Sequence, residues 1–283
     1  MVLNGVTGPA RRGHPRWRTL ALGAALGLAL LRPAAPLAAA DTADVTIFTD
    51  DAYPPYSYAV DGQARGVYPA ILRAGFARMP GYRVQMQPVP WKRGLKALEQ
   101  GETLALVPPY FRPDERPYMA YSQPILAESV VLFCTDSAMP RGRSRRWPED
   151  FFGLRIGMNS GFLAGGPEFE KALKLGRLTL AEARGTTENV KKLLLGRIDC
   201  YANDRFSILQ ALAQVRSESA FRHGENVSEA AVISQENGFL GYTRSDKGRF
   251  PFKDDFIQQF NAALAELKRS GEIEQIVNRE LGR

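Results

Sequence analysis

Two arginines stand in a proline-rich segment directly after a short apolar run. The run Leu104–Val107 is typical of a buried strand, and residues 108–124 contain five prolines together with Arg112 and Arg116. Proline has no amide hydrogen and favours an extended residue before it, so the segment is predicted to be a stiff loop. A guanidinium held at the end of a strand can bind a carboxylate through two parallel hydrogen bonds. The segment therefore predicts a carboxylate-binding loop, and the alternative is a pair of surface charges beside a turn.

The cysteine and histidine content argues against metal and nucleophilic chemistry. The chain has two cysteines, Cys134 and Cys200, and two histidines, His14 and His223, without the spacing of a metal site or a catalytic triad. We therefore expect no metal, no cofactor and no catalytic residue. In an exported protein the two cysteines can form a disulfide, and the alternative is two separately buried thiols.

The arginine loop follows an alternation of strands and helices that is typical of an α/β unit. Val45–Thr49 and Tyr82–Pro88 alternate like strands, whereas Tyr68–Met79 and Trp91–Gln100 have helical apolar spacing. Together with the Leu104–Val107 strand, this order predicts a mainly parallel sheet covered by helices on both faces.

The same alternation starts again in the second half of the chain. Strands are predicted over Leu154–Met158, Leu178–Ala183 and Ile198–Tyr201, with helices between and after them. Two extended runs, Glu128–Phe133 and Gly238–Thr243, link the halves. We therefore predict a two-lobed α/β fold, with two mainly parallel sheets joined by two hinge strands and a ligand cleft between the lobes. The predicted lobes comprise residues 41–131 and 238–283 for the first and 132–237 for the second.

The first 40 residues are predicted to be a secretory signal peptide. Four arginines precede the apolar run Leu20–Leu31, and Ala38–Ala40 offers a small-residue cleavage site. Of the 37 basic residues, five are arginines of this leader, which has no acidic residue, so 32 basic and 30 acidic residues remain. This near balance argues against nucleic-acid binding. We expect a monomer that is exported to the periplasm.

Five short stretches of the chain stand in the order and spacing of a known protein family. They are Asp51–Tyr56, Trp91–Gly101, Pro113–Arg116 with Tyr121–Pro124, Arg155–Met158 with Gly161, and Gly196–Asp204. Through them the chain resembles the bacterial extracellular solute-binding proteins of family 3, the polar amino-acid class that works with ABC importers. The resemblance extends over roughly Val45 to Leu281. It implies the two-lobed periplasmic-binding-protein fold of type II.

The resemblance also implies roles for residues of both lobes. An arginine of the first-lobe loop binds the ligand's α-carboxylate in this family, and the matching position is Arg116. An aspartate of the second lobe binds the α-ammonium, and it maps onto Asp204. The alternative for Asp204 is an N-cap of the following helix. In the family, the turn after Gly161 helps to hold the carboxylate, and the backbone amides of Phe162 and Leu163 can still donate hydrogen bonds to it here.

Aromatic residues complete the implied site. Tyr53 matches the aromatic residue that covers the ligand in this family, and Trp91 stands where another side-chain contact is usual. Tyr110 and Phe111 are further candidates. Aromatic walls supply apolar area and attract cationic groups. The alternatives are that Tyr53 packs against its neighbouring prolines and that Trp91 belongs to the core.

Three departures from the family pattern widen the choice of ligand. Phe162 and Leu163 take the place of small hydroxyl residues, and Leu104 replaces a common acidic residue. The spacing from Arg116 to Ser122 is also one residue shorter than usual. These changes point from a standard amino acid toward an apolar, aromatic or modified relative.

We therefore predict a periplasmic binding protein, not an enzyme, that delivers an amino-acid-like or carboxylate solute to an ABC permease in the inner membrane. One alternative is an enzyme on the same fold, similar to a cyclohexadienyl dehydratase, with Glu115 or Asp204 as general acid. Another is a ligand-sensing accessory protein that presents its closed form to a separate partner.

Overall fold

A computed structural model describes residues 42–139 and 146–282 of the chain. The predicted signal peptide, residues 1–40, lies outside this part. The strands are β1 (Ala43–Asp50), β2 (Ala52–Tyr53), β3 (Ser57–Val60), β4 (Gln63–Arg65), β5 (Tyr82–Val89), β6 (Ala105–Val107), β7 (Met119–Tyr121), β8 (Leu126–Thr135), β9 (Arg155–Asn159), β10 (Thr179–Ala183), β11 (Cys200–Asp204), β12 (Val227–Gly238) and β13 (Gly241–Thr243). The α-helices are α1 (Val67–Phe76), α2 (Trp91–Glu99), α3 (Pro167–Lys174), α4 (Thr186–Leu194), α5 (Arg205–Ser217), α6 (Lys253–Arg269) and α7 (Glu272–Glu280). None of the helices in these residues is long and apolar enough to cross a membrane.

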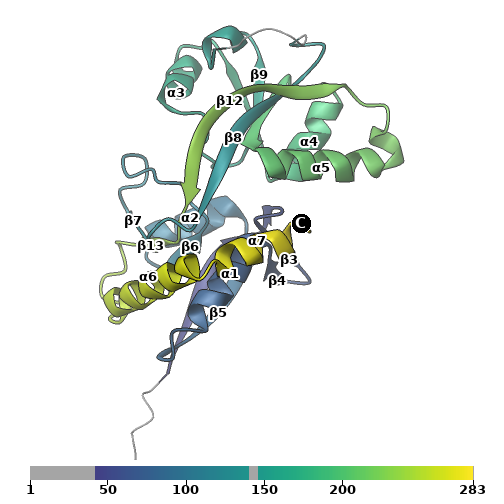
Figure 1. Cartoon of the computed structure of the whole chain (residues 1–283). Coiled ribbons are helices and arrows are strands. Elements are labelled where there is room, and N and C mark those ends of the chain that lie inside the picture. Colours follow the sequence, from purple (N-terminus) through teal and green to yellow (C-terminus); the bar gives the residue numbers. More distant parts are fainter. Residues whose placement is uncertain (1–41, 140–145, 283) are drawn as a thin grey trace, which may run out of the picture. The chain divides into compact units, whose positions relative to one another are not determined.

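The first lobe is built on a five-stranded sheet with the order β5-β1-β6-β13-β7. β1 pairs in parallel with β5 and β6, and β13 pairs antiparallel with β6 and β7. The helices α6 and α7 pack against α1 (Figure 1). The apolar face of α1 contributes Ile71, Leu72 and Phe76 to the core, where Phe76 meets the rings of Phe256 and Phe260. A small antiparallel sheet, β2-β3-β4, follows β1 and was not predicted.

The helix α2 is held close to the sheet, and this fixes the position of its first residue. A Cβ at Gly94 would lie 2.7 Å from Leu106 Cδ1, so the absence of a side chain lets α2 approach β6. The helix begins at Trp91, directly after Pro90, and it buries the indole against Leu98, Leu106 and Met119. Trp91 is therefore placed at the carboxyl ends of β1 and β6.

The second lobe contains a five-stranded sheet with the order β10-β9-β11-β8-β12. β9 lies between β10 and β11 and is parallel to both, whereas β8 runs antiparallel to β11 and β12. Cys134 of β8 stands directly opposite Cys200 of β11, and the two form a disulfide. This lobe therefore has a covalent link between neighbouring strands in addition to its apolar core.

The two strands that link the lobes are β8 and β12, which pair antiparallel over nearly their whole length (Figure 1). The two-lobed α/β fold is confirmed. Both sheets are mixed, because β13 and β7 add antiparallel pairs to the first sheet and the linking strands β8 and β12 add them to the second. The second link was predicted too late in the chain, at Gly238–Thr243, whereas β12 already ends at Gly238. Register shifts near Ala231 and Ser234 break the alternation of β12, which hides it in the sequence. The exact lobe boundaries, 131/132 and 237/238, stay a prediction.

Candidate ligand-binding site

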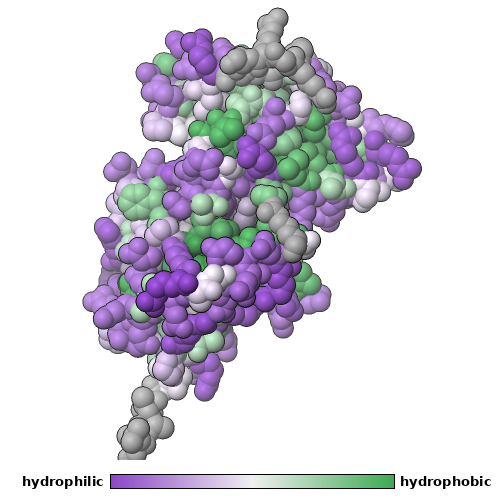
Figure 2. Space-filling view, in the orientation of Figure 1, coloured by the Kyte–Doolittle hydropathy of each residue, from purple (hydrophilic) through white to green (hydrophobic). Residues whose placement is uncertain are grey.

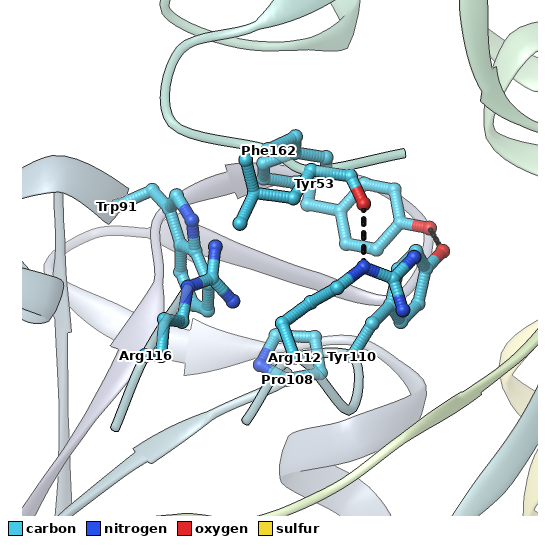
Figure 3. A pocket seen from close by; sticks show the side chains of 8 residues that line it. Tyr53, Trp91, Pro108, Tyr110, Arg112, Arg116 and Phe162 are labelled. Atoms are coloured by element: carbon cyan, nitrogen blue, oxygen red, sulfur yellow. Dashed lines mark hydrogen bonds between the residues drawn. The ribbon is translucent and has the colours of Figure 1, made fainter. Parts of the chain in front are cut away.

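A small cavity is lined by residues from both lobes (Figure 3). Its lining residues are Tyr53, Trp91, Pro108, Tyr110, Arg112, Arg116, Phe162 and Leu163. The cavity volume open to the centre of a water molecule is about 10 Å³, which is room for about one water. Hydrophilic side chains cover most of the face seen in Figure 2, whereas the aromatic rings of Tyr53, Trp91 and Tyr110 on the cavity wall are buried. The predicted residues Tyr53, Trp91, Tyr110, Arg116, Phe162 and Leu163 are thus brought together.

Arg116 places a buried cation on the wall of this cavity. The residue is 4 % exposed, and its Nη2 donates a hydrogen bond to the carbonyl oxygen of Gly161 at 3.0 Å. The guanidinium carbon lies 5.7 Å from the centroid of the Trp91 ring. Burial lowers the pKa of Arg116 below its usual value, since it disfavours the charged form. Within the described residues, no carboxylate forms an ion pair with this guanidinium.

Arg112 has a different role, because its guanidinium already has an anionic partner. Its two terminal nitrogens donate to the carboxylate of Glu236 at 3.1 and 2.7 Å, and its Nε donates to the carbonyl oxygen of Leu163 at 3.0 Å. The arginine therefore ties the strand β12 to the loop after β9. Of the two arginines that the sequence singles out, Arg112 has a carboxylate partner, whereas Arg116 donates to a carbonyl group on the cavity wall.

The loop after β9 inserts an aromatic ring into the cavity (Figure 3). Gly161 has a φ of +81°, a conformation that favours glycine, and the amide of Phe162 donates to the carbonyl oxygen of Asn159 at 2.9 Å. This turn directs the Phe162 ring between Tyr53 and Trp91, with centroid distances of 5.3 and 5.8 Å. The amide of Phe162, predicted to face a ligand carboxylate, is therefore engaged within the turn, and the carbonyl group of Gly161 faces Arg116 instead.

Asp204 does not line the cavity that holds Arg116. It caps helix α5, because its Oδ1 accepts hydrogen bonds from the amides of Phe206 at 2.8 Å and Ser207 at 3.1 Å. Its Oδ2 accepts one from the amide of Ser129 at 3.2 Å. The N-cap alternative accounts for this arrangement, and binding of an ammonium group by Asp204 stays a prediction.

Two other candidates lie away from the cavity. Phe111 is 52 % exposed and packs against Tyr121 and Phe239, with ring centroids 4.9 and 6.0 Å apart. Glu115, considered as a general acid, is exposed and does not line this cavity. Among the described residues there is also no cluster of histidine, cysteine, aspartate and glutamate that is suited to a metal ion.

A buried glutamate behind the aromatic wall was missed in the sequence. Glu128 of β8 accepts hydrogen bonds from the hydroxyls of Tyr53 and Tyr68, and from that of Tyr110 at 2.7 Å. Burial, followed by the nearby charge of Asp204, raises the pKa of Glu128 to about 7, although the tyrosine hydrogen bonds oppose the shift. The available signal was one acidic residue inside a mostly apolar strand. The hydroxyls of Tyr53 and Tyr110 are turned toward Glu128, so mainly their rings face the cavity.

Further contacts join the two lobes around the cavity. Lys92 pairs with Glu182 at 2.7 Å, Arg184 pairs with Asp51, and Trp91 Nε1 donates to the carbonyl oxygen of Gly161 at 3.3 Å. The residues that surround the cavity therefore belong to a closed arrangement of the lobes.

Solved structures with the same fold include binding and sensor proteins. A histidine kinase sensor domain similar to periplasmic binding proteins matches with a TM-score of 0.70 and 17 % identity, over 85 % of this chain and 97 % of that chain. The arginine-, lysine-, histidine-binding protein ArtJ from Geobacillus stearothermophilus has a TM-score of 0.66 and 16 % identity, over 85 % and 96 %. The ancestral amino acid-binding protein AncCDT-1, a precursor of cyclohexadienyl dehydratase, has a TM-score of 0.63 and 16 % identity, over 84 % and 95 %. At these identities the likeness establishes the fold alone.

The sequence comparison assigns the family. No curated protein matches the chain significantly. The model of the bacterial extracellular solute-binding proteins, family 3, matches residues 45–283. The chain therefore belongs to the bacterial extracellular solute-binding proteins of family 3.

Proposed function

We propose that the protein captures a small carboxylate solute in the periplasm and presents it, in the closed form, to an ABC importer. The observation that carries this proposal is the buried Arg116 guanidinium on the cavity wall, with a carbonyl group as its hydrogen-bonding partner. Removing a charged group from water is costly unless a counter-charge is present. A ligand carboxylate supplies that counter-charge through charge-assisted hydrogen bonds.

Closure of the two lobes couples binding to a signal that a partner can recognise. The cavity wall takes Arg116 and Trp91 from the first lobe and Phe162 from the second, so a ligand between them contacts both. A ligand that contacts both lobes stabilises the closed form more than the open one. The proposal includes an N-terminal signal peptide over residues 1–40, a monomeric protein and an ABC permease as its partner.

Two alternatives to transport are a sensing role and a dehydratase activity. The likeness to a histidine kinase sensor domain supports a sensing role, in which the partner is a signalling protein. A binding measurement does not separate transport from sensing, whereas co-purification with a permease or a sensor protein does.

The dehydratase alternative requires a general acid, and no acidic residue is among those lining the cavity. Turnover of prephenate or arogenate by the purified protein would establish it.

The test of the proposed function is a thermal-shift screen with amino acids, opines and small organic acids. A carboxylate that reaches 100 times its Kd stabilises the folded protein by about 2.7 kcal/mol. We expect at least one carboxylate to raise the Tm of the wild type and Arg116→Gln to abolish this shift. The matched control is Arg83→Gln, since Arg83 is an exposed arginine of the same lobe, paired with Asp44. An undiminished shift in Arg116→Gln would show that the carboxylate binds elsewhere.

A further inference from the structure

We propose that Phe162 is an internal ligand, and that the natural solute is an arylalkyl carboxylate that displaces it. This inference rests on the proposed function and names the chemical class of its solute. The segment Gly161–Phe162 supplies both parts of such a molecule. Its ring occupies the aromatic part of the cavity, and its carbonyl oxygen occupies the position beside the buried arginine.

The ring of Phe162 has the contacts expected of a bound aromatic group. It meets Tyr53 at an interplanar angle of 87° and Trp91 at 72°, which are both edge-to-face arrangements. The two partner rings are themselves almost completely buried, at 1 % and 5 % exposure. They form the aromatic wall of the first lobe, whereas Phe162 arrives from a loop of the other lobe. A free aromatic ring can therefore replace the Phe162 ring without rearrangement of that wall.

The carbonyl oxygen of Gly161 has the contacts expected of a bound anion. Two donors converge on it, Nη2 of Arg116 at 3.0 Å and Nε1 of Trp91 at 3.3 Å. A neutral carbonyl oxygen is the weaker acceptor for a guanidinium, and a carboxylate forms the shorter and stronger bond. A solute carboxylate at this position therefore gains more from the two donors than the loop does.

The covalent path between the two parts sets the length of the solute. The Phe162 ring is joined to the Gly161 carbonyl carbon through Cβ, Cα and the amide nitrogen of Phe162, as the sequence order requires. In phenylbutyrate three methylene groups join the ring to the carboxylate carbon, which is the same number of atoms. Phenylbutyrate is therefore the simplest probe that can reach both positions at once.

The charges around the cavity favour an acid without an ammonium group. The lining residues include two arginines and no acidic residue. Asp204 is engaged as the cap of α5, and Glu128 lies behind the tyrosine hydroxyls. An ammonium group in the cavity would lose its hydration without gaining a carboxylate partner. The solute class is thus an arylalkyl carboxylate rather than a zwitterionic amino acid.

The test compares wild type, Phe162→Ala and the double variant Phe162→Ala, Arg116→Gln by calorimetric titration with phenylbutyrate. Phe162→Ala removes the competing ring, so we expect it to bind phenylbutyrate about tenfold or more tightly than the wild type. The double variant should lose about tenfold or more of that affinity. Hexanoate, which lacks the ring, and phenylbutylamine, which lacks the carboxylate, should bind Phe162→Ala at least about tenfold more weakly. The matched control is Phe152→Ala, because Phe152 is an exposed phenylalanine of the same lobe that packs against Arg177.

The outcomes separate this inference from the proposed function. Equal affinity of wild type and Phe162→Ala for phenylbutyrate, with unfolding curves showing both variants folded, would overturn the internal-ligand proposal. Hexanoate binding as tightly as phenylbutyrate, with dependence on Arg116, would overturn the aromatic class and leave carboxylate capture in place. Tighter binding of a zwitterionic amino acid than of phenylbutyrate would also overturn the assignment of the solute as an arylalkyl carboxylate. If Arg116-dependent binding is absent for every carboxylate in the screen, the proposed function itself fails.

Discussion

Replacing both cysteines by alanine is expected to lower the free energy of unfolding by about 4 kcal/mol. Cys134 and Cys200 are 66 residues apart, so their disulfide closes a long loop and restricts the unfolded chain. Both side chains are also buried, at 1 % and 0 % exposure, where they join neighbouring strands of the second sheet. A loss of this size is a large part of the stability of a typical domain.

The measurement is urea unfolding of wild type, Cys134→Ala and the double variant. The single substitution already breaks the disulfide, so it should cause most of the loss, and the second substitution should add only a small packing term. Mass analysis after thiol alkylation, with and without reductant, verifies that the wild type carries the bond. A double variant within about 1 kcal/mol of wild type would contradict the stabilising role, because that is far below the chain-entropy value.

Replacing Glu128 by glutamine is expected to change how stability depends on pH. The folded-state pKa of Glu128, about 7, lies above its usual value of 4.5, because the carboxyl is buried and lies near Asp204. The folded protein therefore retains a proton that the unfolded chain releases. The stability linked to this group is fully present below about pH 4.5, falls as the pH rises, and is lost above about pH 7, with a total effect of about 3 kcal/mol. Glutamine does not titrate, so it removes this contribution.

Urea unfolding of wild type and Glu128→Gln at about pH 5 and about pH 8 measures this effect. The stability of the variant relative to wild type should be higher at pH 8 than at pH 5 by about 2 to 3 kcal/mol. Asp50 is also buried, and burial raises its pKa to about 7. Because Asp50 contributes to the pH dependence of both proteins, the difference in unfolding free energy between them is compared at each pH. Near-ultraviolet circular dichroism of the variant verifies that the three tyrosines keep their packing. Parallel pH profiles would contradict a protonated Glu128 in the folded state.

The sequence predicts the position of Arg116 because local features determine it. An apolar run followed by several prolines favours a buried strand and then a stiff loop. The order of motifs in the family places the arginine in that loop. The start of α2 at Trp91 is equally local, because Pro90 precedes a helical apolar pattern. These two residues belong to the first-lobe side of the cavity, together with Tyr53, Pro108, Tyr110 and Arg112.

The remaining features depend on contacts between distant segments. Nothing within the loop itself specifies that Phe162 turns toward Tyr53, since these residues are brought together only by the packing of the two lobes. Glu128 shows the same limit, because its tyrosine partners Tyr53 and Tyr68 are 75 and 60 residues away. Asp204 was given both a ligand and a capping role, and only the geometry of α5 reveals that its carboxylate caps the helix.

A crystal structure of the wild type with the carboxylate that gives the largest thermal shift tests the central claim most directly. We expect the two carboxylate oxygens within about 3 Å of the Arg116 guanidinium nitrogens, with the Gly161 carbonyl group displaced from them. A structure in which the carboxylate lies elsewhere, while Arg116 Nη2 keeps its hydrogen bond to Gly161, would contradict the account.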